Sequence, residues 1–482
     1  MSHRTIDPVD TIWLNMDRDN NLMVIESLMT FDGPVDWERF LAVFERRVVD
    51  PFPVFRQKPV WSGMPFATPR WYDDEDFDLH RHVRRATLCA PGDDAALQDY
   101  ISSYAGRPLH RDRPLWQVHL IDGYEGGSAV YSRLHHALAD GIALTQVLLS
   151  LVDDTPGADL AEPPEHAEHA RGALTLAADA AGGAASALGH ALLELPHMLT
   201  PAYAVDAFST TAQATGVAAK LLFAKSPHGP LSGVPGIRKR VLWGAPTPLA
   251  DVVAVGKATG TTVNDVLVAA LAGALSAYLV EQGSDPADLP TMVPVNVRPP
   301  DQPLPRVLGN QFALVLLSLP SELTTPFARL AETHRRMEAI KHSPEVWLTF
   351  GMIQGIGRTG PEIERFLVNF FAGKATGVTT NVPGPRSAVY VAGSRVRSML
   401  GWAPGSGNQT LETSLFTYAG NLHVGFKVDV DTVADPERLV ELFGAELAAL
   451  GELTTPTRPP RPIRRKGRGK AVASAAGAVG SA

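Results

Sequence analysis

Two adjacent histidines, His135 and His136, are followed four residues later by an aspartate and a glycine, Asp140 and Gly141. A neutral imidazole has an ordinary pKa of about 6.5, so it can act as a general base at neutral pH. In that role it takes a proton from an alcohol, thiol or amine while the same group attacks a carbonyl carbon. These four residues are therefore the candidate catalytic group of the chain.

The histidines lie where a predicted strand ends and a loop leads into a predicted helix. Residues 128–134 alternate like a strand, with Val130 and Leu134 on one face. Residues 142–152 carry apolar side chains three, four and seven positions apart, which predicts a helix. A rigid scaffold can aim side chains at such a junction into a cleft. Because successive strand side chains point to opposite faces, we expect one histidine to serve the chemistry and the other to anchor the loop.

Two other kinds of site fit these residues less well. Zinc usually takes three or four ligands from a protein, and adjacent histidines on a strand diverge, so we predict no metal. A serine hydrolase would need a G-x-S-x-G elbow, to which Gly405-Ser406-Gly407 is only a loose approximation. A purely structural role for the histidine pair stays open at this point.

The run from residue 135 to residue 141 resembles the H-H-x-x-x-D-G signature of CoA-dependent acyltransferases and peptide-synthetase condensation domains. Further short motifs are similar to those of the bacterial wax ester synthase/acyl-CoA:diacylglycerol acyltransferase family, of the mycobacterial triacylglycerol synthase type, and fall in its order. They are Pro8-Val9-Asp10-Thr11-Ile12-Trp13-Leu14, Phe77-Asp78-Leu79, His82-Val83-Arg84-Arg85, Pro91-Gly92, Pro114-Leu115-Trp116, Asn264-Asp265-Val266, Val293-Pro294-Val295-Asn296-Val297-Arg298, Leu308-Gly309-Asn310 and Asn381-Val382-Pro383-Gly384-Pro385. Any one motif is weak, but the ordered set covers most of residues 5–450 and is specific.

The resemblance implies an α/β (α+β) fold of two chloramphenicol acetyltransferase-like lobes, each a mixed sheet with helices, that face a central tunnel. It also implies an O-acyltransferase that moves a long acyl chain from acyl-CoA to the hydroxyl of diacylglycerol, a fatty alcohol or both. No cofactor is expected beyond acyl-CoA as substrate. One alternative is the same fold with a polyketide alcohol or an amine as acceptor. Another is a catalytically silent lipid-surface protein, against which the intact histidine motif argues.

The resemblance also suggests roles within the motif. His136 is the expected base, because the second histidine holds that role in the families it resembles, and His135 then supports the loop. Asp140 has two interpretations: it orients His136 as a triad carboxylate, or it caps the following helix and pairs with an arginine. In condensation domains that arginine comes from the other half, and Arg298 is the matching residue. Gly141 would let the backbone turn closely and free an N–H for an oxyanion.

Three asparagines of the second half are candidates for substrate binding or structural support. Asn310 and Asn381 lie in family-like motifs, where they line the tunnel, hold strand ends through hydrogen bonds, or only shape a loop. Asn264 follows Thr262, which together with Asp265 has the spacing of a capping box. We therefore interpret Asn264 as a polar residue of a helix start.

Shifts in composition predict four segments along the 482 residues. They are an N-terminal acyltransferase lobe (1–155), a helical crossover linker (156–245), a C-terminal acyltransferase lobe (246–455) and a disordered tail that is basic and then rich in alanine and glycine (456–482). Within the C-terminal lobe, alternation predicts strands at 292–297, 312–319, 389–396 and 422–430.

Composition limits the partners. A net charge of −8 gives no reason to expect nucleic-acid binding, and the single cysteine excludes an internal disulfide. No uninterrupted apolar stretch reaches about 18 residues, so we predict no spanning helix. Seven basic residues between 458 and 470 either keep the tail solvated or attract it to an anionic membrane surface. We expect a cytoplasmic protein, peripheral to the inner face of the membrane or to lipid droplets, that meets diacylglycerol or fatty alcohol there.

Overall fold

The computed structural model describes residues 3–62, 68–158, 220–221, 224, 226–298 and 304–454. The predicted crossover helices fall almost entirely outside these residues, and the predicted basic tail does so completely. The described chain forms two large mixed sheets and a small three-stranded sheet, of β1 (His3–Thr5), β4 (Arg70–Asp73) and β3 (Gln57–Val60).

The first large sheet carries the histidine motif. Its order is β13 (Tyr390–Val391), β14 (Ser394–Trp402), β2 (Val24–Phe31), β7 (Gly127–His135), β6 (Trp116–Tyr124) and β5 (Val83–Thr87). The strand predicted at 128–134 is confirmed as β7, and every residue of β7 is buried. Antiparallel pairing places Val24 opposite His135, the last residue of β7. The histidines therefore stand at the strand's end, as the sequence predicted.

The second large sheet comes from the later part of the chain. Its order is β11 (Phe312–Leu319), β10 (Leu289–Asn296), β12 (Gly377–Pro383), β15 (Leu411–Tyr418), β16 (Asn421–Asp429) and β8 (Lys239–Trp243), and β9 (Thr247–Pro248) also pairs with β16. Strands predicted at 292–297, 312–319 and 422–430 are confirmed within two or three residues at their ends. Residues 239–243, near the end of the predicted crossover, form strand β8, which pairs with β16.

The strand predicted at 389–396 is wrong in its extent. Ala392 and Gly393 both have positive φ, 49° and 86°, and this tight turn breaks the run into β13 and β14. Strand β14 then crosses to the first sheet, where it pairs with β2. The first sheet therefore contains strands from both sides of residue 246, where the C-terminal lobe was predicted to begin. The predicted domain limits themselves stay predictions.

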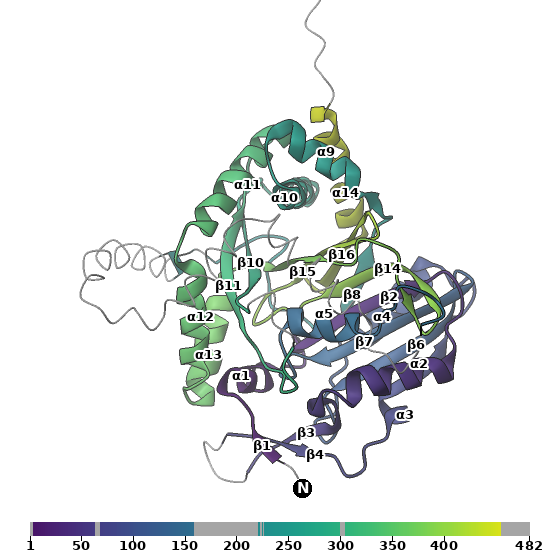
Figure 1. Ribbon diagram of the computed structural model, residues 1–482. Coiled ribbons are helices and arrows are strands. Elements are labelled where there is room, and N and C mark those ends of the chain that lie inside the picture. The colour runs from purple at the N-terminus through teal and green to yellow at the C-terminus, as the bar shows by residue number, and fades with distance from the viewer. Residues whose placement is uncertain are drawn as a thin grey trace, which may run out of the picture.

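Helices cover both sheets (Figure 1). They are α1 (Pro8–Met16), α2 (Trp37–Phe44), α3 (Leu79–His82), α4 (Asp94–Ala105), α5 (Gly141–Leu149), α9 (Leu249–Thr259), α10 (Val263–Glu281), α11 (Pro326–Lys341), α12 (Glu345–Ile356), α13 (Pro361–Ala372) and α14 (Glu437–Gly451), with shorter π and 3-10 turns at Glu45–Val49, Pro53–Arg56 and Glu452–Thr454. Helices α1, α2 and α5 pack in the core of the first sheet, whereas α9, α10, α11 and α14 pack in that of the second. Trp116 is 2% exposed, as its predicted core role requires.

Helix α10 begins with the predicted capping box. Thr262 accepts from the N–H of Asp265 at 3.2 Å, and Asp265 accepts from the N–H of Thr262 at 2.9 Å. By length and composition alone, α10 is apolar enough to span a membrane, with a mean hydropathy of 1.8, although its apolar run is interrupted by polar residues. In the structure α10 packs against α9, α11 and α14, and 78% of its most apolar 18-residue stretch is buried, as in a core helix.

Candidate active site

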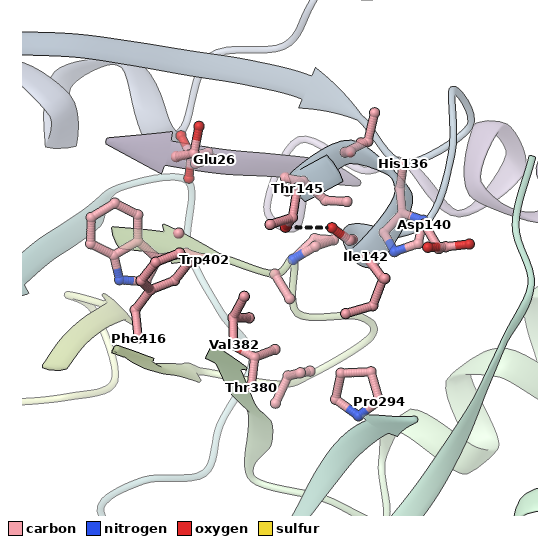
Figure 2. Close-up of a pocket in the computed structure, with 18 of the residues that line it drawn as sticks. Glu26, His136, Asp140, Ile142, Thr145, Pro294, Thr380, Val382, Trp402 and Phe416 are labelled. Atoms are coloured by element: carbon pink, nitrogen blue, oxygen red, sulfur yellow. Dashed lines mark hydrogen bonds between the residues drawn. The ribbon is translucent and has the colours of Figure 1, made fainter. Parts of the chain in front are cut away.

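A pocket of about 1300 Å³, counting the part open to solvent, lies between the two large sheets. Strands β2 and β14 and helix α5 line it from one side, and β10, β11 and β12 from the other. His136, Asp140, Gly141 and Asn381 are among the lining residues, whereas His135, Arg298, Asn310 and Asn264 are not. Figure 2 shows His136 and Asp140 together at one side of the lining. The predicted motif thus opens into an apolar pocket between the lobes.

His136 is held against aromatic rings. Its imidazole stacks on Trp13 with 4.2 Å between ring centroids, and the ring of Phe312 lies 5.5 Å away. Its backbone N–H donates to the carbonyl of Met23 at 2.7 Å, which fixes the end of β7 against β2. Only 7% of the residue is exposed, and burial lowers the pKa of His136 to about 4. The ring is therefore neutral at ordinary pH, the form in which a base must start.

His135 turns away from the pocket, as strand alternation predicts for a neighbouring residue. Its Nδ1 accepts from the N–H of Ala137 at 3.1 Å, and its Nε2 lies 3.6 Å from Asp17 Oδ2. Burial acts to raise the pKa of Asp17, but His135, the N–H of Met23 and Arg111 together hold it below its ordinary value. Asp17 also accepts from the N–H of Met23 at 2.8 Å. His135 therefore anchors the loop through a carboxylate that the sequence analysis did not single out.

Of the two interpretations of Asp140, the structure shows the second, in which it caps the following helix and pairs with an arginine. Its Oδ1 accepts from the N–H of Ala143 at 2.9 Å, so it caps α5. Its Oδ2 lies 2.8 Å from Arg298 and accepts from the N–H of Gln311 at 2.9 Å. In the described part of the chain no hydrogen bond joins Asp140 to His136. Burial raises the pKa of Asp140, and Arg298 opposes that shift without cancelling it.

A short loop of the second lobe, residues 309–311, holds the motif from the other side. Asn310 Nδ2 donates to the carbonyl of His136 at 2.9 Å and to Asp10 Oδ1 at 2.8 Å. The N–H of Asn310 also donates to Asp10 Oδ1, at 2.9 Å, while the carbonyl of Gly309 accepts from Arg298. Asp10 is 1% exposed, and burial raises its pKa to about 7 against the hydrogen bonds from Asn310. Asn310 therefore supports the motif from behind the pocket.

Replacing Asp10 with alanine should test this support. The change removes the acceptor of two Asn310 donors, and each buried unsatisfied donor costs about 1–3 kcal/mol. We expect the free energy of unfolding to fall by about 1–3 kcal/mol for each donor left unsatisfied. We also expect kcat to fall about tenfold, because His136 is displaced. Asp10→Asn keeps an oxygen acceptor and should stay near wild type. Chemical denaturation and initial rates measure both effects, and an Asp10→Ala enzyme of unchanged stability and kcat would contradict the assignment.

Gly141 is the first residue of α5, where an N–H has no intrahelical acceptor. The predicted close backbone turn is not observed, because a Cβ at this position would have no atom within 4 Å. The missing side chain instead leaves room in the pocket lining. The hydroxyl of Thr145, one turn further on, donates to the carbonyl of Gly141 at 2.7 Å (Figure 2).

Asn264 and Asn381 meet at the second lobe. Asn381 Nδ2 donates to Asn264 Oδ1 at 2.8 Å, which joins the start of α10 to β12. Asn381 also lines the pocket. Among the described residues, no group of three or more histidine, cysteine, aspartate or glutamate side chains is placed to hold a metal ion.

Comparison with known proteins agrees with this architecture. Residues 6–267 match the family model of the wax ester synthase/diacylglycerol acyltransferase catalytic domain, and residues 308–451 match the WS/DGAT C-terminal domain. A probable diacylglycerol O-acyltransferase of Mycobacterium tuberculosis, tgs1, is 30% identical over 452 residues, which are 90% of this chain and 93% of that protein. A second M. tuberculosis protein, a putative diacylglycerol O-acyltransferase, is 28% identical over 488 residues, covering 94% of this chain and 99% of its own.

Two solved structures show the same fold. The wax ester synthase/diacylglycerol acyltransferase of Marinobacter aquaeolei VT8 superposes with a TM-score of 0.65 at 23% identity, over 93% of this chain and 98% of its own. The first condensation domain of the calcium-dependent antibiotic synthetase gives 0.56 at 17% identity, over 94% and 97%. The predicted two-lobe α/β fold is confirmed. The chain belongs to the wax ester synthase/diacylglycerol acyltransferase family and is an acyltransferase.

Proposed function

We propose that this acyltransferase moves a long acyl chain from acyl-CoA to the hydroxyl of diacylglycerol, a fatty alcohol or both, with His136 as general base. The observation that carries the proposal is the neutral imidazole of His136 at the wall of a large, mainly apolar pocket between the lobes. An apolar pocket suits the long chains of both substrates. The names of the relatives, diacylglycerol O-acyltransferase and wax ester synthase, support the choice of acceptors.

In the proposed reaction His136 takes the proton of the acceptor hydroxyl as that oxygen attacks the thioester carbonyl. A C–O bond forms, and the carbonyl electrons move to oxygen in a tetrahedral intermediate. When the carbonyl re-forms, the C–S bond breaks and the sulfur leaves with the proton that His136 had accepted. The products are an ester and free CoA, and the base returns to its neutral form. No covalent enzyme intermediate is needed, so the scheme uses no nucleophilic side chain.

The reaction is tested by product analysis. Purified protein is incubated with labelled palmitoyl-CoA and either dioleoylglycerol or hexadecanol, and the lipids are separated by thin-layer chromatography. The proposal expects labelled triacylglycerol, wax ester or both, together with free CoA in equal amount. The stronger product identifies the preferred acceptor. Absence of labelled ester from both acceptors, with folded protein, would refute the proposed substrates.

The dependence of the rate on pH follows from the pKa of His136. Because the base must be neutral, activity falls as pH decreases through the pKa, which burial lowers to about 4. We therefore expect kcat/KM for ester formation to be flat from about pH 5.5 to 8 and to fall only below that range. An ordinary histidine would lose half its activity near pH 6.5. A half-point near pH 6.5 would contradict a buried neutral base.

We also propose that the enzyme works at the inner face of the membrane or at lipid droplets. Its proposed acceptors are poorly soluble lipids, and each of the basic residues between 458 and 470 can contribute about 1 kcal/mol near an anionic surface. Flotation with phosphatidylglycerol liposomes tests this for the full chain and for a variant that ends at residue 455. We expect the full chain to float and the shortened chain to float less. If neither form floats, surface attachment is refuted.

A further inference from the structure

The two ring nitrogens of His136 lie in different surroundings. Nδ1 is buried and has no hydrogen-bond partner of ordinary geometry among the described residues. Nε2 is not a buried atom of this kind and no described group bonds to it, so it is the nitrogen open to the pocket. A general base needs its lone pair on the nitrogen that meets the substrate. The proton of the neutral ring therefore has to lie on Nδ1, and a hydrogen bond from Nδ1 is what fixes that tautomer.

Asp140 does not supply the acceptor for Nδ1. In a catalytic triad a carboxylate accepts from this nitrogen and holds the tautomer. Here the two oxygens of Asp140 bind the N–H groups of Ala143 and Gln311 and the guanidinium of Arg298 instead. The acceptor has to come from another residue.

The side-chain amide of Asn310 lies behind the imidazole in a fixed orientation. Its Nδ2 donates to the backbone carbonyl of His136 at 2.9 Å and to Asp10 Oδ1 at 2.8 Å, which uses both of its N–H groups. Because a backbone carbonyl can only accept, an amide with oxygen and nitrogen exchanged would lose its bond to His136. The orientation leaves Asn310 Oδ1 buried, again with no hydrogen-bond partner among the described residues.

A ring nitrogen of His136 and an oxygen of Asn310 are thus both unsatisfied on two groups that already touch. Burial lowers the pKa of His136, whereas its own carbonyl and the side chain of Asn310 act to raise it, so Asn310 is within reach of the ring. Catalytic hydrogen bonds are often long or misaligned before substrate binds and shorten afterwards. A proton on Nδ1 can satisfy both atoms, whereas a proton on Nε2 would leave two buried acceptors facing each other.

We propose that Asn310 is a positioning residue that holds the proton of neutral His136 on Nδ1 and so leaves the lone pair of Nε2 for the acceptor hydroxyl. The inference rests on the proposed function, since it treats His136 as the base. In the reaction Nε2 takes the hydroxyl proton and later gives it to sulfur, while Nδ1 keeps its own proton throughout. Asn310 Oδ1 stabilises the imidazolium between these steps. One half of the chain supplies the base, and the other half fixes its tautomer.

The tautomer is measured by ¹⁵N NMR of the full chain labelled at histidine, because protonated and unprotonated ring nitrogens give well-separated signals. The signals of His136 are identified by their loss in His136→Gln. His82 is an internal reference: its Nδ1 lies 2.9 Å from the carbonyl of Trp116, which can only accept, so its Nδ1 carries the proton. We expect His136 to show the same tautomer as His82 at pH 7. A proton on Nε2 of His136 would overturn the proposal.

Asn310→Ala should turn His136 into a mixture of tautomers and lower kcat about 10²-fold with little change in KM, while His82 keeps its tautomer. Asp10→Ala is the matched control. It also removes a hydrogen bond of this amide and costs stability, but it leaves Asn310 Oδ1 and the bond to the His136 carbonyl in place. We expect it to keep the proton on Nδ1. A tautomer unchanged in Asn310→Ala, or shifted equally in Asp10→Ala, would overturn the assignment.

An exchange of the two side chains tests the same contact through the pH profile. Asp10→Asn combined with Asn310→Asp keeps a donor and an acceptor between the two positions and places a carboxylate beside His136. A neighbouring carboxylate favours the imidazolium, so the acid half-point of kcat/KM should rise by about one pH unit or more. Asp10→Asn alone should leave the half-point in place. No rise in the exchanged variant, or an equal rise in the single variant, would contradict the contact.

The NMR measurement does not depend on turnover, so it separates this inference from the proposed reaction. A folded enzyme that forms no ester, yet holds the proton on Nδ1 of His136 only while Asn310 is present, would refute the reaction and leave the role of Asn310 standing. An enzyme that forms ester with the proton of His136 on Nε2 would do the reverse.

Discussion

His136→Ala should reduce kcat for ester formation by about 10³-fold, within the range that a general base contributes. The variant keeps Asp140, Arg298 and the loop at 309–311, so the pocket stays assembled and KM should change little. Labelled palmitoyl-CoA with the preferred acceptor gives the rate, and circular dichroism with thermal unfolding reports the fold. The loss comes from the missing proton acceptor, since no other imidazole is among the described residues of the lining.

His136→Ala also removes a ring that stacks on Trp13, so packing needs its own control. Trp13→Phe keeps an aromatic ring beside His136 and should retain kcat within about threefold. His135→Asn is the matched change at the neighbouring position. Because His135 lies outside the lining, it should act mainly on stability. Full activity of folded His136→Ala would refute the base assignment, even though the chain would still be an acyltransferase of this family.

Arg298→Ala should lower the free energy of unfolding by about 3–5 kcal/mol, because it leaves Asp140 buried without its cationic partner. Asp140 is 2% exposed, and its Oδ2 lies 2.8 Å from Arg298. We also expect kcat to fall, since the loop at 309–311 loses a contact that holds it to the motif. Denaturant unfolding at constant pH measures the stability, and a change below about 1 kcal/mol would contradict a structural ion pair.

The stability loss should grow with pH. Burial raises the pKa of Asp140, and removal of Arg298 raises it further, while the unfolded chain has an aspartate pKa of about 3.9. Above that value the unfolded state loses its proton more readily than the folded state, so folding becomes less favourable as pH rises toward the folded pKa. Arg298→Ala should therefore be closer to wild type at pH 5 than at pH 8.

A double variant checks the cause. Asp140→Asn combined with Arg298→Ala removes the unpaired charge and keeps an oxygen that can cap α5. It should recover most of the stability that Arg298→Ala loses and should lack the added pH dependence. Equal destabilisation of the single and double variants would show that Arg298 acts through packing and not through Asp140.

Local sequence patterns correctly predicted how the histidine motif is positioned at the end of a strand and the start of a helix. Alternation along a strand fixes which way neighbouring side chains point, so the divergence of His135 and His136 followed from sequence alone. Capping chemistry is equally local, and Thr262 with Asp265 formed the expected box. The pairing of Asp140 with Arg298 joins distant parts of the chain, and the family resemblance suggested it where spacing could not.

The residues that were not singled out depend on long-range contacts. Asp10 and Asp17 lie in or beside α1, more than a hundred residues before the histidines, and nothing in their local sequence marks them as partners. The same holds for Glu26 and Lys427, which meet only because β2 and β16 belong to facing sheets. The division into lobes had a similar limit, because no local pattern says that β14 leaves its own half for the other.

The crossing of β14 has a mechanical consequence. A segment of the second half is hydrogen-bonded to β2 across six residue pairs, and the same segment, with β2, forms part of the pocket wall. This backbone ladder joins the two halves, so they cannot separate by a hinge motion without breaking its hydrogen bonds. A polypeptide that ends before residue 390 would lack β13 and β14, and one edge of β2 would then be unpaired.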